Sequence, residues 1–486
     1  MHRHRKNFPV LILALLVAVG CARNPVTGDR QLALISEEQE IAMGREAHPH
    51  ILQEFGRVDD AGLQGYTDSI GQRLAGLSHR PDLEWHFTVV DVPVVNAFAV
   101  PGGYIYFTRE IMAYMNNEAE FAGVMSHEIG HVTARHSVSQ ISKAQLFSLG
   151  LGLGSIFSPT FRQLGEVAQM GVSVLFLKYS RDAEEQSDQL GIEYMSEAGY
   201  DPRELSDFFT VFQRMQEESG QALPSWLSSH PAPPDRIEDT SAMAQQVVQQ
   251  NPNQNWIDGR QRFLQQLEGI VFGNNPREGF MADGTFLHPE LRFQMRFPNG
   301  WNVQNTRSSV QAVNPNQDAA IQLTLADAPS GTSPDQYAAS IANMSGVRLV
   351  DGRRATVNGN PAFLGVYDLQ NPNGFIVRAL AAFVSYRGSL YQLVGMSERG
   401  NFSRYQNTLE ASLTSFSELN DPAALNVQPD RIQIVTARGG DTLARIADRI
   451  NNPRVQGNEI ALLNRIDPNE PLSSGTLVKV VVPGRR

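Results

Sequence analysis

The chain has 486 residues, a formal net charge of −11 and a single cysteine. That length is too great for one ordinary domain and predicts about two to four. Lysine and arginine are scattered beyond the first few residues, so no basic surface points to nucleic acid as a partner. Because one cysteine cannot form an intramolecular disulfide, the fold must rest on core packing.

The N-terminus is typical of a secretory signal of the lipoprotein type, at residues 1–20. It is basic at first, then continuously apolar, and Cys21 follows directly. The apolar run is too short to span a bilayer as a stable helix. Residues 18–21 resemble a bacterial lipobox, which implies a lipid on Cys21, and Ala22 resembles the next residue of lipoproteins sent to the outer membrane. A plain signal peptide with a free cysteine is the alternative.

Residues 21–36 are polar and contain a proline and a glycine, which predicts a tether. From Glu37 onward, apolar residues recur at helical spacing and predict two early helices. His48-Pro49-His50 offers two histidines near a predicted helix end. The proline between them favours a solvated turn over a metal pair.

A hairpin is predicted next. Residues 83–95 are β-rich, and residues 96–107 predict two strands joined at a Pro-Gly-Gly turn. A proline beside a strand places that strand at a sheet edge, where backbone groups can accept an extended peptide. We therefore expect a substrate-binding edge formed by Asn96, Ala97, Phe98 and Ala99. A simple hairpin is the alternative.

A helix that carries a histidine motif follows. Asn117 and Glu120 indicate an N-cap with a reciprocal partner, and the apolar residues after them predict one flank packed into a core. His127 and His131 lie four residues apart, so both imidazoles can reach one Zn²⁺ from the same helix face. Glu128 between them is placed to act as a base toward water. An ordinary helix with two surface histidines is the alternative.

His136 lies five residues beyond the motif, which on a continuous helix rotates it off the ligand face. We interpret it as structural. Two apolar segments follow, residues 147–157 and 172–177, and neither is long enough to span a membrane. Two interpretations of these segments stay open: a mobile lid over the site, or a buried helical hairpin.

A second predicted helix supplies a candidate third ligand. A zinc site with two histidines needs a third protein ligand and one open position. Glu184 and Asp188 lie four residues apart and share a helix face. Glu184 is the candidate ligand, and Asp188 is placed to orient a ligand imidazole through its other ring nitrogen. A charged, solvated helix face is the alternative.

These motifs, in this order, resemble the family-forty-eight metallopeptidases, which include the HtpX-like and CaaX prenyl proteases. The resemblance covers about residues 36–245 and is carried by residues 96–103, His127 to His131 followed by His136, Ser180-Arg181 with Glu184 and Asp188, and residues 199–202. It implies a mostly helical zinc endopeptidase with a small sheet, one Zn²⁺ per chain and a glutamate as third ligand, here Glu184. Gln186-Ser187 stand where many members have Glu-Ala.

Ser229-His230-Pro231, followed by Arg236-Ile237, resembles the periplasmic branch of that family. The resemblance implies that His230 approaches the metal. It would then act either as an inhibitory latch in the open position or as a group that stabilises the transition state. An ordinary loop histidine is the alternative.

Two further regions follow the zinc metalloprotease domain, which we place at residues 37–270. In residues 275–420, the phrase Phe297-Pro298-Asn299-Gly300-Trp301 resembles the photosystem protein PsbP and Mog, which are α/β sandwiches. Residues 430–486 predict the order strand, helix, helix, strand, which resembles a LysM module. Such modules are associated with N-acetylglucosamine polymers such as peptidoglycan; a mere fold cap is the alternative.

The predicted fold is multidomain α+β. It comprises a mainly helical zincin (gluzincin-like) catalytic domain with a small sheet, an α/β sandwich-like domain and a small βααβ module. The resemblance and the export signal imply a zinc metalloendopeptidase that cleaves unfolded or misassembled cell-envelope proteins in the periplasm, held by its lipid at the inner leaflet of the outer membrane. The rival hypothesis is a non-proteolytic, chaperone-like outer-membrane assembly factor anchored to peptidoglycan.

Overall fold

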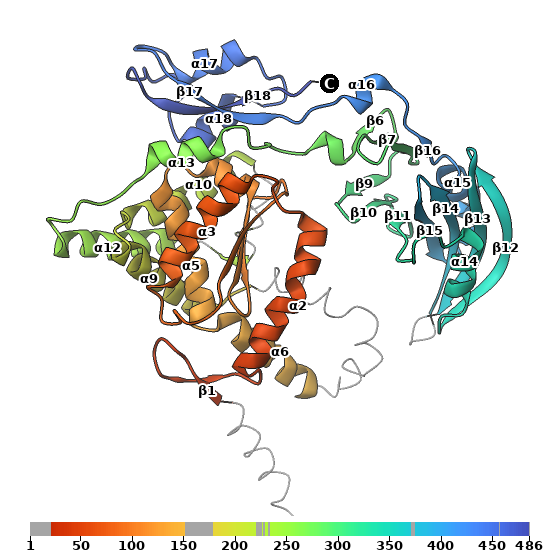
Figure 1. The fold of residues 1–486 in the computed structure, drawn as a ribbon, viewed down its shortest axis with the longest axis horizontal. Helices are drawn as coiled ribbons and strands as arrows, with labels where there is room; N and C mark the ends of the chain where they lie inside the picture. Colours follow the sequence, from red (N-terminus) through yellow and green to blue (C-terminus); the bar gives the residue numbers. More distant parts are fainter. Residues whose placement is uncertain are drawn as a thin grey trace, which may run out of the picture. The chain divides into compact units, whose positions relative to one another are not determined.

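The computed structural model divides into two compact units, Met1–Asn274 with Asp430–Pro483 and Asn275–Pro429 with Gly484–Arg486 (Figure 1). The predicted signal peptide and residues 151–177, which hold most of the two apolar segments considered as a lid or a hairpin, lie outside the described residues. The structure describes residues 21–150, 178–219, 226, 229–231, 234–370, 375–455 and 457–485. Within these, no helix is both long and apolar enough to cross a membrane.

The first unit is mainly helical and also holds several short strands. Its helices are α2 (Glu37–Phe55), α3 (Ala61–Ala75), α4 (Arg109–Tyr114), α5 (Glu118–Thr133), α6 (His136–Gly150), α9 (Arg181–Glu197), α10 (Arg203–Ser219), α12 (Pro234–Gln250), α13 (Arg260–Leu267), α17 (Leu443–Ile450) and α18 (Gly457–Asn464). Its strands are β1 (Cys21–Arg23), β2 (Arg30–Leu32), β3 (His86–Val90), β4 (Ala97–Val100), β5 (Tyr104–Thr108), β17 (Arg431–Thr436) and β18 (Leu477–Val482). Within the predicted tether, β1 pairs antiparallel with β2.

A three-stranded sheet with the order β3-β5-β4 lies beside the helices. β4 and β5 are antiparallel, and the predicted Pro-Gly-Gly turn joins them. Gly102 and Gly103 both have positive φ, and a Cβ on Gly103 would lie 2.5 Å from the Glu84 carbonyl oxygen, so the turn requires glycine there. The hairpin prediction is confirmed, and β4 lies at an edge of the described sheet.

The prediction of a solvated turn at His48-Pro49-His50 is wrong. Pro49 lies inside α2, and His48 Nδ1 is 2.7 Å from the Tyr106 hydroxyl of β5. Buried Ala47 and Ile51 fix the helix against the sheet on either side of the proline, and this packing outweighs the helix-breaking tendency of the proline.

The α5 helix is the centre of this unit. Its predicted N-cap is confirmed, because the Asn117 side chain accepts a hydrogen bond from Glu120 N at 2.8 Å. Every residue of α5 is buried, whereas the sequence pattern predicted one packed flank. A Cβ on Gly130 would lie 3.2 Å from the Leu190 side chain, and one on Gly191 would lie 3.3 Å from His127 N. Glycines on both helices therefore let α5 and α9 approach closely enough to bring their polar side chains together.

The C-terminal segment has the predicted order of strand, helix, helix and strand, from β17 to β18. Leu463 and Val481 join the same hydrophobic core as the α5 helix. Buried Lys479 donates hydrogen bonds to the carbonyls of Ala113 and Met115, each at 2.6 Å. The segment is thus built into the first unit at the end of α4, and its likeness to a LysM module stays a prediction.

The second unit is rich in antiparallel sheet. One sheet has the order β12-β13-β14-β15-β11-β10-β9, and a smaller one has the order β16-β8-β7-β6. The elements are η1 (Pro276–Glu278), β6 (Phe280–Ala282), β7 (Thr285–His288), β8 (Phe293–Arg296), β9 (Asn302–Asn305), β10 (Ser309–Val313), β11 (Ala319–Leu325), α14 (Pro334–Ala342), β12 (Val347–Val357), β13 (Asn360–Gln370), β14 (Ile376–Tyr386), β15 (Ser389–Glu398), α15 (Phe402–Leu413), β16 (Ser417–Glu418) and α16 (Pro422–Leu425). The protein is therefore multidomain, with helices and several sheets.

Candidate metal centre

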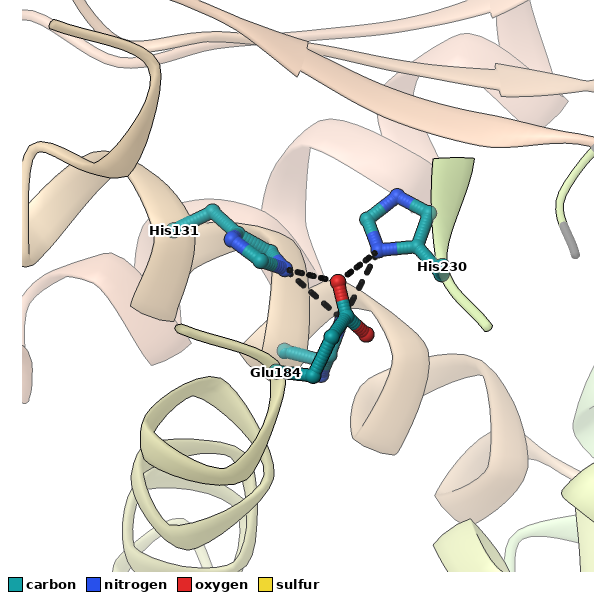
Figure 2. Close-up of side chains that lie close together, drawn as sticks. His131, Glu184 and His230 are labelled. Atoms are coloured by element: carbon teal, nitrogen blue, oxygen red, sulfur yellow. Dashed lines mark hydrogen bonds and ion pairs between the residues drawn. The ribbon is translucent and has the colours of Figure 1, made fainter. Parts of the chain in front are cut away.

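Four buried side chains from three parts of the first unit converge on one point. His127 and His131 come from α5, Glu184 from the first turn of α9, and His230 from the segment before α12. Each offers one ligand atom, and these atoms all lie within 4.8 Å of one another. Figure 2 shows Glu184 between His131 and His230. The structure therefore brings together all three predicted metal ligands and the predicted latch histidine.

The distances and donor types suit zinc. The Nε2 atoms of His127 and His131 are 3.0 Å apart, and Glu184 oxygens lie 3.7 Å and 3.5 Å from them. Two imidazole nitrogens and a carboxylate are a donor set that tetrahedral Zn²⁺ takes in catalytic sites. Burial, helped by the neighbouring histidines, lowers the pKa of His131 well below its usual value. The imidazole is therefore neutral, which is the form that binds a metal.

Glu128 lies beside this cluster and is not one of its four members. Its side chain is fully buried, and neither carboxylate oxygen accepts a hydrogen bond from a described residue. His230 Nε2 lies 3.5 Å from its Oε1 atom. Burying a carboxylate without hydrogen bonds costs free energy of folding. This cost indicates that Glu128 serves the reaction and not the stability of the fold.

Asp188 lies where the sequence predicted it. Its Oδ1 atom is 2.9 Å from Nδ1 of His127, the ring nitrogen on the far side from the cluster. This contact fixes the orientation of the imidazole and makes it a better ligand. Burial raises the pKa of Asp188, but the Arg236 guanidinium outweighs it and lowers the pKa to about 2. Asp188 is thus an anion at any physiological pH.

The sequence pattern shows Arg236 only as part of a motif and does not reveal its role in the site. Its Nε and Nη2 atoms donate to both oxygens of Asp188, at 2.6 Å and 2.8 Å. Its Nη1 atom lies 2.6 Å from Glu184 Oε2 and donates to the Pro231 carbonyl at 3.0 Å. The guanidinium is buried against Phe209. One arginine therefore compensates both carboxylates of α9 and holds the segment that carries His230.

His136 lies next to the cluster but is not one of the four residues that converge. Its Nδ1 atom is 2.9 Å from Nδ1 of His131, and its Nε2 atom is 3.0 Å from Gln186 Oε1. The prediction placed it off the ligand face by continuing the helix. However, α5 ends at Thr133, and the positive φ of Arg135 turns the chain back. His136 therefore contacts a predicted metal ligand without joining the cluster, and its structural role stays a prediction.

Two aromatic side chains, also missed from the sequence, fix the imidazoles. The Tyr179 ring stacks on His131 with centroids 3.9 Å apart, and its hydroxyl is 2.8 Å from Ser137 Oγ. The Trp226 ring stacks on His230 with centroids 4.9 Å apart. Neither residue belongs to a spacing pattern that sequence reasoning could use.

The predicted substrate edge divides between two faces of the sheet. Ala97 and Ala99 join the core around α5, whereas Phe98 stacks on Tyr106 on the opposite face, with centroids 4.9 Å apart. Asn96 is buried, and its Oδ1 atom has no hydrogen-bond partner among the described residues. Binding of substrate at these residues stays a prediction, as does the lipid on Cys21.

Comparison with known proteins identifies a family domain within the chain. Residues 62–244 match the family model described as Peptidase family M48, a range that contains every predicted metal and catalytic residue. The chain carries a peptidase family M48 domain. This M48 domain is a zinc metallopeptidase domain, and zinc is its cofactor.

Two relatives illustrate how far the similarity of the M48 domain extends. Mitochondrial metalloendopeptidase OMA1 of Arabidopsis thaliana is 34% identical over 176 residues, which are 36% of this chain and 35% of that protein. Beta-barrel assembly-enhancing protease of Yersinia pestis is 28% identical over 233 residues, 46% of this chain and 47% of that protein. The chain thus spans about a third to a half of the length of these relatives.

A solved structure is also similar to part of this chain. Cyanobacterial PsbP from Synechocystis sp. PCC 6803 shares 14% identity at a TM-score of 0.24, and the match covers 28% of this chain and 91% of that one. A similarity at this TM-score supports no conclusion about function, so the prediction for residues 275–420 stays a prediction.

Proposed function

We propose that this chain is a zinc-dependent metalloendopeptidase of the gluzincin type that cleaves unfolded or misassembled cell-envelope proteins. The observation that carries the proposal is the buried convergence of His127, His131 and Glu184 beside a carboxylate, Glu128, that accepts no hydrogen bond from a described residue. The name of the Yersinia pestis relative, beta-barrel assembly-enhancing protease, supports a client in the envelope.

Each residue of the site has a separate role in the proposed hydrolysis. His127, His131 and Glu184 would hold one Zn²⁺, which when bound polarises the scissile carbonyl and lowers the pKa of a water toward about 7. Glu128 accepts the proton of that water and later returns it to the leaving amine. Asp188 and Arg236 keep the ligand side chains oriented and ionised for this purpose.

The edge strand β4 suits an extended substrate. An extended peptide that pairs along Asn96, Ala97, Phe98 and Ala99 would be held by main-chain hydrogen bonds. Such binding requires a locally unfolded chain and asks little of its side chains. The protease would therefore select its clients by disorder more than by sequence.

The test compares one outer-membrane β-barrel protein in two states, unfolded from urea and folded in detergent. We expect the wild type to cleave the unfolded state and to spare the folded one, because only the unfolded chain can pair with β4. Fragments are followed by electrophoresis, with Glu128→Gln as the inactive control. Equal cleavage of both states would refute selection by disorder, and cleavage of neither would refute the proposed client class.

We further propose that His230 is a latch that occupies the open side of the site. Its Nδ1 atom lies 3.0 Å from Glu184 and 3.3 Å from His127 Nε2, where it can act as a fourth ligand. Replacing His230 with alanine should then raise the rate of cleavage of an unfolded protein several-fold, because a position opens for water. His50→Ala, at a half-buried position of α2 outside the cluster, is the matched control. A loss of activity would instead assign His230 to the stabilisation of the transition state.

The location of the enzyme is also a proposal. A lipid on Cys21 would hold it at the inner leaflet of the outer membrane, in the periplasm, and residues 430–486 would contact peptidoglycan. Because Lys479 and its neighbours pack into the first unit, a pull-down with peptidoglycan should use the full chain. Retention by peptidoglycan that survives washing is expected if the segment binds glycan, and no retention removes that part of the proposal.

A further inference from the structure

The β12 strand forms one edge of the seven-stranded sheet in the second unit. It runs for 11 residues and pairs with β13 on one side, and no strand among the described residues pairs with its other side. Figure 1 shows it at the rim of that sheet. A long edge strand presents a row of backbone donors and acceptors that another extended chain can pair with.

The side chains of β12 are unusually accessible for a strand of this length. All ten positions from Val347 to Thr356 are partly or fully exposed, on both faces of the sheet, and only Val357 is buried. Leu349 and Val350 are 38% and 41% exposed, although both are apolar. The register with β13 skips Val350, so this residue forms a bulge and takes no part in the existing ladder.

The charge of the strand is one-sided. Three arginines, Arg348, Arg353 and Arg354, stand against one aspartate, Asp351, whereas the whole chain has a net charge of −11. The arginine side chains pair with Asp368, Glu410 and Asp335 but remain 64%, 65% and 81% exposed. Their guanidinium groups are therefore accessible to the side chains of a partner at the edge.

The arginines favour one kind of binding partner for the β12 edge over another. If two copies of the chain paired β12 against β12, arginines of one copy would lie opposite or near arginines of the other, which is destabilising. An extended segment with acidic side chains would instead meet opposite charge beside Arg353 and Arg354. Apolar side chains in the same segment would cover Leu349 and Val350.

We propose that β12 is a docking edge for an extended segment of an unfolded polypeptide, one that carries acidic residues and alternating apolar residues and adds to the sheet as a further strand. The choice of an unfolded client as the source of this segment rests on the proposed function. The edge would then hold a client by one segment, separately from the segment that is cut.

The test uses the full chain with Glu128→Gln, so that binding is measured without cleavage. The probe is a fluorescent peptide of alternating valine and threonine with two aspartates near one end, and the comparison peptide has lysines in place of the aspartates. Anisotropy gives the affinities, and amide hydrogen exchange locates the site. We expect the acidic peptide to bind about tenfold more tightly than the basic one and to protect the amides of β12.

Two variants sharpen the result. Val350→Pro removes an amide from the edge at the bulge, where the β13 ladder does not need it, and should abolish binding of the acidic peptide. Gln304→Glu, on the exposed β9 edge of the same sheet, should leave binding unchanged.

The proposal is overturned if the peptide protects other amides but not β12, if both peptides bind equally, or if sedimentation shows a dimer that Val350→Pro dissolves. If the wild-type chain fails to cleave unfolded protein while the Glu128→Gln chain still binds the peptide at β12, the proposed function is refuted and the docking edge stands.

Discussion

Replacing Glu128 with glutamine is expected to lower kcat/KM for an unfolded protein by about 10²–10⁴-fold while leaving the zinc content of the protein unchanged. Glutamine keeps the size of the side chain but cannot accept a proton from water. Glu128 is not among the four residues whose ligand atoms converge, so the metal site keeps its donors. Initial cleavage rates and elemental analysis of the same preparation measure the two quantities.

Glu185→Gln is the matched control for this prediction, because Glu185 is an exposed glutamate on α9 next to a ligand. Its kcat/KM should equal that of the wild type. If Glu128→Gln retained wild-type activity, Glu128 would not be the base. If it lost zinc, the loss of activity would have another cause.

Replacing Arg236 with glutamine should have the second largest effect. The substitution leaves Glu184 and Asp188 buried without their cation, and breaking a buried ion pair from one side costs about 3–5 kcal/mol of the free energy of unfolding. Loss of the oriented carboxylates should also lower the affinity for zinc by about 10–100-fold. Denaturant unfolding and chelator competition measure these two changes.

Arg236→Lys separates charge from geometry. Lysine keeps the charge but cannot donate to both oxygens of Asp188 at once, so we expect only part of the zinc affinity to return. Arg214→Gln, at an exposed position on α10, serves as the control and should change neither quantity. Full zinc affinity in Arg236→Gln would show that the guanidinium stabilises the fold without organising the site.

The metal ligands could be predicted from the sequence because each depends on local geometry. His127 and His131 share a helix face through their spacing, and the N-cap at Asn117 makes that helix predictable. Glu184 and Asp188 follow the same rule on α9. The structure confirms that these two helices meet.

Other parts of the site depend on tertiary structure and left no local signal. His136 contacts the predicted ligand His131 because α5 ends at Thr133, and one residue with positive φ then reverses the chain. Arg236 contacts Asp188 across 48 residues of sequence. Lys479 binds the carbonyl of Ala113 across 366 residues, which no periodic pattern reports.

At His48-Pro49-His50 the local rule gave a wrong prediction: the proline predicts a turn, but the segment is helical. Proline disfavours a helix interior, but packing of α2 on the sheet through buried Ala47 and Ile51 decides the outcome. The local propensity was read correctly, and tertiary packing outweighed it.

The most direct test of the central claim is metal analysis paired with digestion of casein by the same sample. The protein should contain one zinc per chain, lose both zinc and proteolysis on treatment with a chelator, and regain both when Zn²⁺ is added. Double replacement of His127 and His131 with alanine should abolish both together. Proteolysis that persists after the zinc has been removed would contradict the assignment of this site as a zinc peptidase centre.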